Sequence, residues 1–415
     1  MSVSYHCNNK INLSVTSGCF TRRWLGVTVI IMVIGCATNP GGDCLEQGLS
    51  RSTYTVILAD TLGLTIPSYG LNNYKQRHLL QDSLLYLYDN RLPGKVDVFN
   101  IRSESFSHRI ELSTLGFASD LGNMFVKNKD SLFFLGDHSK KLYLFSGAGK
   151  YLRSWGLSGL SFTTADGFTT NDFIFPTMLF DVGPFIGNDL QLYLTLAPVG
   201  IEDNNEVARV SELQAIYDLK KEKYLFAYAP YEGFMREKGN MFYPYDVSFP
   251  YRLVLPDQIL ISYPLDHVVY HYDKKTGKLL KRTCFAVKEA LAFPSGLSQE
   301  QIDDRELSWN LRVTTPFYGP VFYHRALKLY SRIYYHEQEL FDNEGYVNSG
   351  ADRIATLILM NQQGKKVNET TFRNGLLGVH KVIALPDGWL AASNSHYWKE
   401  ENELVYKYLF SIEGL

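Results

Sequence analysis

One strand–turn–strand pattern recurs along the chain and limits the folds open to it. Its clearest copy spans residues 130–152 and contains two apolar segments, 131–136 and 140–146, a turn with two glycines at 146–149, and a third extended segment. Leu, Phe and Tyr suit a pleated, half-buried surface, and glycine tolerates the positive φ of a tight turn. The pattern therefore predicts three consecutive antiparallel strands joined by short turns.

Further copies of this pattern set its spacing. They start near residues 82 and 257, with looser copies at 189–228 and 327–372 and a last one at Pro386. The copies begin roughly 45–70 residues apart, which is the range of four-stranded propeller blades. An apolar segment before each copy would supply the innermost strand. The sequence therefore predicts an all-β fold, a six-bladed β-propeller of four-stranded antiparallel blades.

The two ends of the chain predict how the ring closes. The last copy offers strands near 379–385, 388–393 and 404–411 and leaves no fourth strand, whereas a spare strand lies at 53–58. Pairing the N-terminal strand with the last blade would remove an exposed sheet edge. We therefore expect an N-terminal strand to close the propeller. The alternative is that both chain ends fray.

The N-terminal residues are typical of a lipoprotein signal peptide. Arg22 and Arg23 precede an apolar segment at 25–35, which is shorter than the ~20 residues that span a bilayer. Gly35 and Cys36 end this segment in a pattern that resembles the bacterial lipobox. We expect a signal peptide at 1–35, a lipid on Cys36, a polar tether at 36–51 and one propeller domain at 52–415. An uncleaved anchor and a signal without lipidation are the alternatives.

The resemblance to Gram-negative lipoproteins also implies an address. Ala37, and not the Asp that retains lipoproteins in the inner membrane, follows Cys36. The resemblance therefore implies that the protein lies in the cell envelope and is held at the outer membrane by its lipid anchor. We expect no disulfide between Cys44 and Cys284, because one lies in the tether and the other in a strand. The formal net charge of −2 gives no electrostatic signature of nucleic-acid binding.

Three long connections between blades, at 157–187, 229–251 and 286–323, indicate where a binding site would lie. Such connections cross the same face of a propeller, which is often the binding face. The third contains a capping-box pattern that starts at Ser298, and it predicts a short helical insertion near 299–309. We expect Trp309 to pack this helix onto the body of the protein.

The last two connections hold aromatic side chains next to charged ones. Aromatic faces beside a carboxylate and a guanidinium can stack on sugar rings or anchor a peptide. The alternative is that the aromatic rings pack between blades. The candidate ligand-binding residues are Tyr243, Tyr245, Asp246, Tyr251, Arg252, Tyr318, Tyr323, His324 and Arg325.

The lipobox, the strand pattern and the aromatic, Arg-containing stretch at 315–336 together resemble a group of Bacteroidetes lipoproteins, domain-of-unknown-function family 4221. Members of that family resemble TolB-like six-bladed propellers. The strand that resembles the family's Tyr-Tyr-Arg-like strand runs from Arg332 to His336, where Arg and His have different places. The resemblance implies a propeller over about 50–415 and brings no established activity.

The sequence shows no spacing that specifies catalytic or metal chemistry. His324, His336, His380 and His396 fall at comparable places in the last two blades without forming a metal-ligand pattern. Carboxylates at Asp246, Glu337, Glu339 and Asp342 could in principle form a pair for glycoside hydrolysis. We predict no catalytic residue, no metal and no cofactor.

Two functions remain open. The favoured one is a non-enzymatic binding or protein-interaction module for a glycan, a peptide or an envelope protein, with no nucleic-acid partner. The alternative is a glycan- or peptide-processing enzyme with its site in the central funnel of the propeller.

Overall fold

The structure is a computed structural model of the whole chain. It describes residues 54–64, 76–81, 83–88, 93–114, 116–160, 162–163, 169–170, 173–174, 185–198, 213–230, 249–287, 296–298, 300–301, 304–348, 353–372, 382–392 and 403–412. These ranges all lie within one unit, Pro40–Leu415. The predicted signal peptide, the tether and Cys36 lie outside the described residues.

The described strands form four-stranded antiparallel blades. The first blade pairs β2 (Gln76–Leu80), β3 (Leu84–Tyr88), β4 (Lys95–Asn100) and β5 (Ser105–Glu111) in chain order. The next pairs β6 (Leu121–Asn128), β7 (Ser131–Gly136), β8 (Lys141–Phe145) and β9 (Tyr151–Gly156). A short 3-10 turn, η2 (Ala118–Asp120), joins them. The apolar segment predicted as an innermost strand at 123–126 lies in β6.

The later blades follow the same order. They are β13 (Phe185–Ile186), β14 (Gln191–Thr195), β16 (Gln214–Asp218) and β17 (Lys223–Tyr228); β18 (Tyr251–Val254), β19 (Gln258–Ser262), β20 (Val268–Asp273) and β21 (Leu279–Cys284); and β22 (Phe317–His324), β23 (Leu329–Tyr335), β24 (Ala355–Asn361) and β25 (Lys366–Phe372). Two small pairs accompany them, β10 (Phe162–Thr163) with β11 (Thr169–Thr170), and β12 (Phe173–Ile174) with β15 (Ala197–Pro198).

The closing blade combines both ends of the chain. It contains β26 (Val382–Leu385), β27 (Gly388–Ala392) and β28 (Glu403–Ile412), and its outermost strand is β1 (Tyr54–Leu64). β1 runs antiparallel to β28, from Tyr54 opposite Ile412 to Leu64 opposite Glu403. The predicted closure by an N-terminal strand is therefore confirmed.

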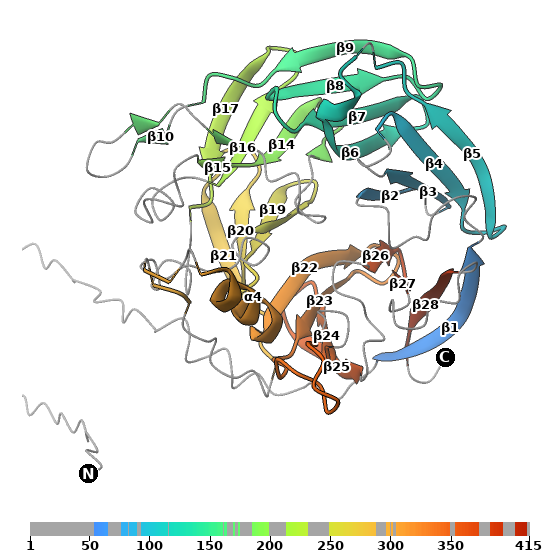
Figure 1. Cartoon of the computed structure of the whole chain (residues 1–415), viewed down its shortest axis with the longest axis vertical. Coiled ribbons are helices and arrows are strands. Elements are labelled where there is room, and N and C mark those ends of the chain that lie inside the picture. The colour runs from blue at the N-terminus through green and yellow to red at the C-terminus, as the bar shows by residue number, and fades with distance from the viewer. Residues whose placement is uncertain are drawn as a thin grey trace, which may run out of the picture. The chain divides into compact units, whose positions relative to one another are not determined.

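The blades follow one another around a ring (Figure 1), and apolar residues fill each seam between neighbours. At the seam where the ring closes, Leu385 of β26 packs with Leu85 and Leu87 of β3. On the other side of the closing blade, Val56 of β1 and Trp389 of β27 pack with Leu357 of β24. Since each strand alternates its side chains between two faces, every blade buries apolar groups against both neighbours.

The repeated strand pattern has a local structural cause at the outer hairpins. The third strand of several blades ends in Asn or Asp, at Asn100, Asp218, Asp273 and Asn361. Each side-chain oxygen accepts hydrogen bonds from backbone N–H groups two to four residues later, for example from Arg102 at 2.9 Å and from Thr276 at 2.7 Å. These side chains start the turn that leads into the outermost strand.

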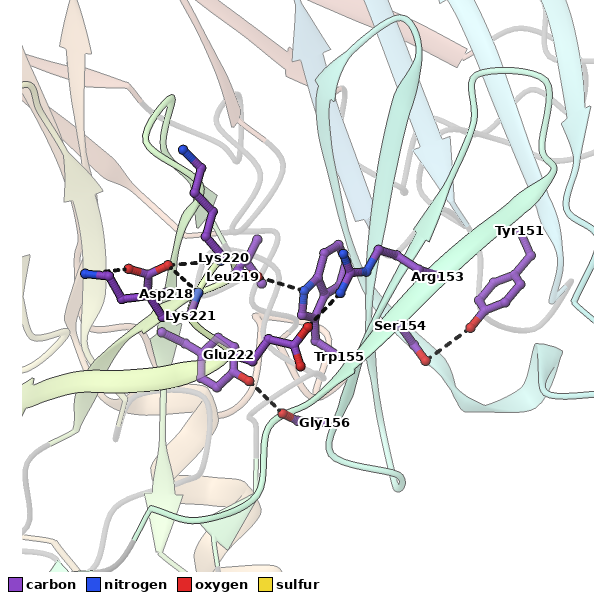
Figure 2. Close-up of polar contacts among 11 residues, drawn as sticks. Tyr151, Arg153, Ser154, Trp155, Gly156, Asp218, Leu219, Lys220, Lys221 and Glu222 are labelled. Carbon is purple, nitrogen blue, oxygen red and sulfur yellow. Dashed lines mark hydrogen bonds and ion pairs between the residues drawn. The ribbon is translucent and has the colours of Figure 1, made fainter.

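Figure 2 shows how an outer strand contacts the next blade. The indole Nε1–H of Trp155 in β9 donates to the carbonyl oxygen of Leu219 at 3.0 Å. The guanidinium of Arg153 lies 4.2 Å from the centre of the Trp155 ring and forms a 2.8 Å ion pair with Glu222. Because both charged groups are exposed, the ion pair stabilises the seam little, and the buried indole contributes more.

The helical insertion begins later than the sequence predicts. The α-helix that the structure describes here, α4, spans Arg305–Thr314, and Asp304 caps it by accepting from the N–H groups of Glu306 and Leu307. The predicted capping box at Ser298 forms a turn instead, in which Ser298 N–H donates to Gln301 Oε1 at 3.1 Å. The helix is therefore capped by Asp304 and not by the predicted capping box.

Two further expectations are corrected. The predicted link at 286–323 ends earlier, because β22 begins at Phe317 and takes Tyr318 and Tyr323 into the innermost strand of its blade. Cys284, expected without a bridge, is disulfide-bonded. All other cysteines of the chain lie at residues 7–44, so its partner lies outside the described residues.

Candidate functional site

Strand direction divides the functional residues between two faces of the propeller. In each blade the innermost strand begins, and the outermost strand ends, on the face crossed by the links between blades. The turn between the second and third strands lies on that same face, because the strands alternate in direction. We call it the link face. It carries α4 and the β23–β24 hairpin, whose described residues are 336–348 and 353–354.

The predicted ligand-binding residues fall into three groups. Tyr243, Tyr245 and Asp246 lie outside the described residues. Tyr251, Arg252 and Tyr318 stand at the starts of β18 and β22, toward the link face. Tyr323, His324 and Arg325 stand at the far end of β22, on the opposite face; five residues of strand separate Tyr318 from Tyr323 by about 16 Å. The structure therefore does not bring the described members of the set into one site.

Arg252 lies in the seam between β18 and the preceding blade. Its Nη1 donates to Thr195 Oγ1 at 3.1 Å and to Gln214 Oε1 at 2.6 Å. Both partners are buried. Burial lowers the pKa of Arg252 to about 10, which leaves it charged at neutral pH. In this seam Arg252 connects the two blades.

Arg332 has a similar place in the next seam and is not among the predicted ligand-binding residues. It is fully buried in β23, where its Nε donates to Gly319 O at 3.0 Å and its Nη2 to Tyr263 O at 2.7 Å. Its guanidinium lies 4.5 Å from the centre of the Tyr318 ring. Burial lowers the pKa of Arg332 to about 10, partly opposed by the nearby Tyr318 and Asp266. An Arg inside an otherwise apolar, aromatic strand is the sequence signal for such a contact.

His324 is also a buried structural residue. Its Nδ1–H donates to the carbonyl oxygen of Leu385 in the next blade at 2.8 Å, and its Nε2 accepts from the Ser331 hydroxyl at 2.6 Å. Burial lowers the pKa of His324 to about 4. The ring is therefore neutral at pH 7 and joins β22 to β26. Tyr323 accepts from Gln362 Nε2 at 3.0 Å, and Arg325 is exposed.

Exposed apolar side chains lie on two segments of the link face, α4 and the β23–β24 hairpin. In the described part of the chain, the large hydrophobic side chains that remain exposed include Trp309 at 50%, Phe341 at 53% and Tyr346 at 69%. We name this set the aromatic corner, and its residues on α4 and the β23–β24 hairpin are Leu307, Trp309, Phe341, Tyr346, Val347 and Ile354. Trp309 was expected to pack this helix onto the body, and half of its surface faces outward.

The hairpin that presents Phe341 and Tyr346 has a defined conformation. Phe341 pairs with Val347 across it. The Asp342 carboxylate accepts from the N–H groups of Glu344 at 2.8 Å and Tyr346 at 2.9 Å. Its own side chain thus stabilises the turn, and the exposed rings are held in place before any partner arrives.

Arg353 joins the hairpin to α4. Its Nη1 donates to the carbonyl oxygens of Thr315 and His336, both at 2.8 Å. Its Nη2 donates to the carbonyl oxygens of Arg312 at 3.1 Å and of Val313. A buried cation at the C-terminus of α4 satisfies the last carbonyl groups and complements the helix dipole. The two parts of the aromatic corner are therefore fixed to one another.

Exposed carboxylates lie on the same two segments as the aromatic corner. Asp304 and Glu306 begin α4, and the hairpin adds Glu337, Glu339, Asp342 and Glu344, all exposed. The exposed basic residues of these two segments are Arg305 and Arg312. Asp342 caps its own turn, and nothing aligns the hairpin carboxylates as the hydrolytic pair considered above. Among the described residues, no group of three or more His, Cys, Asp or Glu side chains could hold a metal ion. None of the described helices is long and apolar enough to cross a membrane.

The comparisons with known proteins concern the fold. No family model and no curated protein matches the chain. Among solved structures, the chain is similar to a member of the DUF4221 family from Bacteroides vulgatus, with a TM-score of 0.63 and 13% identity over 88% of this chain and 100% of that one. A putative exported protein from Bacteroides fragilis gives a TM-score of 0.49 at 12% identity, over 88% of this chain and 97% of that one. BamB from Moraxella catarrhalis gives 0.35 at 10% identity, over 87% and 92%.

The similarity to the Bacteroides vulgatus protein confirms, at the level of the propeller fold, the resemblance to domain-of-unknown-function family 4221 that the sequence indicates. At this identity it carries the fold and no activity.

Proposed function

We propose that this protein is a lipid-anchored β-propeller of the cell envelope that acts as a non-enzymatic interaction module. The observation that supports this function is the aromatic corner, where Trp, Phe and Tyr side chains are exposed on a rigid support. Exposed apolar clusters with a polar rim are typical of protein-binding surfaces, and Trp, Tyr and Arg are the residues that most often dominate binding energy. An Arg is also present, because the guanidinium of Arg312 lies 5.6 Å from the centre of the Trp309 ring.

We infer that the ring holds six blades. The support is that apolar clusters join each four-stranded sheet to the next, including the closing pair β26 and β3. Residues 52–415 would then form the single propeller domain expected from the sequence.

The anchor and the address rest on the sequence. Cys36 would carry the lipid, residues 36–51 would tether the propeller, and the outer membrane would be its location. Cys36→Ser in the full chain should move the protein from the membrane fraction to the soluble fraction. N-terminal sequencing separates the alternatives, since an uncleaved precursor that stays membrane-bound would contradict lipidation at this residue.

Site-specific photo-crosslinking of the full chain in intact cells tests the docking surface. A photoreactive phenylalanine analogue at position 346 should give a discrete adduct, and the same probe at exposed Leu152 on β9 should not. The adduct at 346 should disappear with Trp309→Ala, because the two residues belong to one surface. Equal adducts at both positions, or none at position 346, would rule out the aromatic corner as the docking site.

The ligand-binding role of Tyr251, Arg252, Tyr318, Tyr323, His324 and Arg325 stays a prediction. Their hydrogen bonds and burial support a different proposal for Arg252 and His324, which connect blades.

A further inference from the structure

We infer that the aromatic corner binds a basic, partly apolar polypeptide segment of another protein. This inference rests on the proposed function and adds the chemistry of the partner. Its observation is the charge on the segments that carry the exposed rings, where the described residues include six exposed carboxylates and two exposed guanidinium groups. The carboxylates are Asp304, Glu306, Glu337, Glu339, Asp342 and Glu344.

The carboxylates lie where a partner would meet them. Along the hairpin Glu339, Asp342 and Glu344 alternate with the exposed Phe341 and Tyr346. Within the described part of the chain, Glu337, Glu339 and Glu344 form no ion pair that neutralises them. A segment that covers the rings must therefore come close to these negative charges. Lys or Arg side chains would meet them favourably, whereas acidic residues would be repelled.

The same charges disfavour the other occupants of an apolar surface. A bilayer surface with anionic head groups would repel the rim, although exposed Trp and Tyr otherwise suit a membrane interface. In a two-fold dimer built on this surface, each acidic rim would face its own copy. Like charges brought together in this way cost free energy, so a second copy of this chain fits poorly.

The inference is tested by fluorescence anisotropy with the mature, non-lipidated chain and three labelled peptides of equal length. All three contain the same Leu and Phe residues, spaced by Lys, by Glu or by Ser. We expect the Lys peptide to bind at least tenfold more tightly than the Ser peptide, and the Glu peptide to bind weakest. The dissociation constant for the Lys peptide should rise as salt screens the charges.

Two sets of variants assign the binding to the surface. Trp309→Ala with Tyr346→Ala should weaken the Lys peptide at least tenfold, and Leu152→Ser, an equally exposed apolar position elsewhere, should leave it unchanged. Glu339→Lys with Glu344→Lys should reverse the preference toward the Glu peptide. Circular dichroism melts show whether each variant keeps its fold.

The outcomes separate the inference from the proposed function. If the Ser or Glu peptide binds as tightly as the Lys peptide and needs Trp309, the interaction surface stands and the basic partner is excluded. If the Lys peptide binds both sets of variants with the same dissociation constant as the wild type, this surface is excluded as its binding site. No binding by any of the peptides would overturn both proposals. Binding of wild-type protein to anionic vesicles, lost with Trp309→Ala, would replace the polypeptide partner by a membrane.

Discussion

At the scale of single residues, this protein uses buried basic side chains to hold its parts together. Arg332 and Arg252 lie in neighbouring seams between blades, and Arg353 ties the β23–β24 hairpin to α4. Their hydrogen bonds reach backbone carbonyls and uncharged side chains. Such an arrangement satisfies acceptors that the irregular backbone would leave unpaired, which matters more than the charge itself.

Arg353→Lys should therefore destabilise the protein by about 2–3 kcal/mol. An ammonium group cannot reproduce the planar fork that reaches four carbonyl oxygens, so several buried acceptors at the end of α4 would lose their donors. Urea unfolding measures the loss, and Arg305→Lys, exposed on the same helix, serves as the control with an expected change within about 0.5 kcal/mol. Equal midpoints for the two variants would show that Arg353 contributes no more than a surface cation.

His324 should make stability depend on pH. Its folded-state pKa of about 4 lies below the ordinary value of 6.5, so the unfolded chain binds a proton between these values and the folded protein does not. The contribution of His324 to the free energy of unfolding is thus fully present above pH 6.5. It is lost as the pH drops toward 4, by about 1.4 kcal/mol per pH unit. The slope between pH 6 and pH 5 should be smaller by this amount in His324→Gln than in wild type. Leu152→Ser, an exposed substitution without a titrating group, should keep the wild-type slope; parallel curves for all three proteins would contradict the assignment.

The sequence shows which residue types could form a site, but it predicts less well whether each residue is buried or exposed. Tyr318 and Arg252 were expected in connections, yet both belong to innermost strands and are held in seams. Trp309 was expected to pack α4 onto the body of the protein, and half of its surface is exposed. Aromatic residues serve the core and binding surfaces equally well, so only the position of α4 on the link face decides between the two roles.

At the scale of elements, strand and turn signals proved reliable because they are local. The Asn and Asp residues that end the third strands form their turns with groups of the next few residues. The start of α4 was predicted too early, because the capping-box pattern at Ser298 forms a turn and Asp304 caps the helix. The disulfide of Cys284 was likewise out of reach, since pairing depends on distance in the folded chain.

Substitution of Asp304 and of Ser298 tests which of the two residues caps α4. Asp304→Ala should lower the free energy of unfolding by about 1 kcal/mol, because two N–H groups at the start of α4 lose their acceptor. Ser298→Ala should change it by less than about 0.5 kcal/mol, since Ser298 lies in a turn before the helix. Urea unfolding of both variants measures the difference. A larger loss for Ser298→Ala would mean that the helix in solution starts where the sequence first suggested.

At the scale of the whole molecule, the repeat accounts for most of the fold. Spacing, alternation and the unequal strand count at the two chain ends were enough to predict four-stranded blades closed by the N-terminal strand. The interaction surface was not predictable in the same way. It combines α4 and a hairpin that are separate in the sequence and meet only because the propeller places its links and second turns on one face.

Closure of the ring should dominate the stability of the whole domain. Val56→Asp should lower the free energy of unfolding by about 2 kcal/mol, because it places a carboxylate on the side of β1 that packs with Leu357 and Trp389.

Removing residues 54–64 should abolish the cooperative thermal transition by exposing β28 as an edge. Leu152→Ser on the exposed β9 strand controls for surface changes. An unchanged melting temperature after the deletion would contradict closure by β1.

The most direct test of the account compares one dissociation constant in two proteins, that of the Lys-containing peptide for the wild type and for Trp309→Ala with Tyr346→Ala. We expect a loss of at least tenfold in affinity with an unchanged melting temperature, because both rings are exposed and contact the peptide rather than the core of the protein. Equal affinities in two equally stable proteins would contradict an interaction module that works through the aromatic corner.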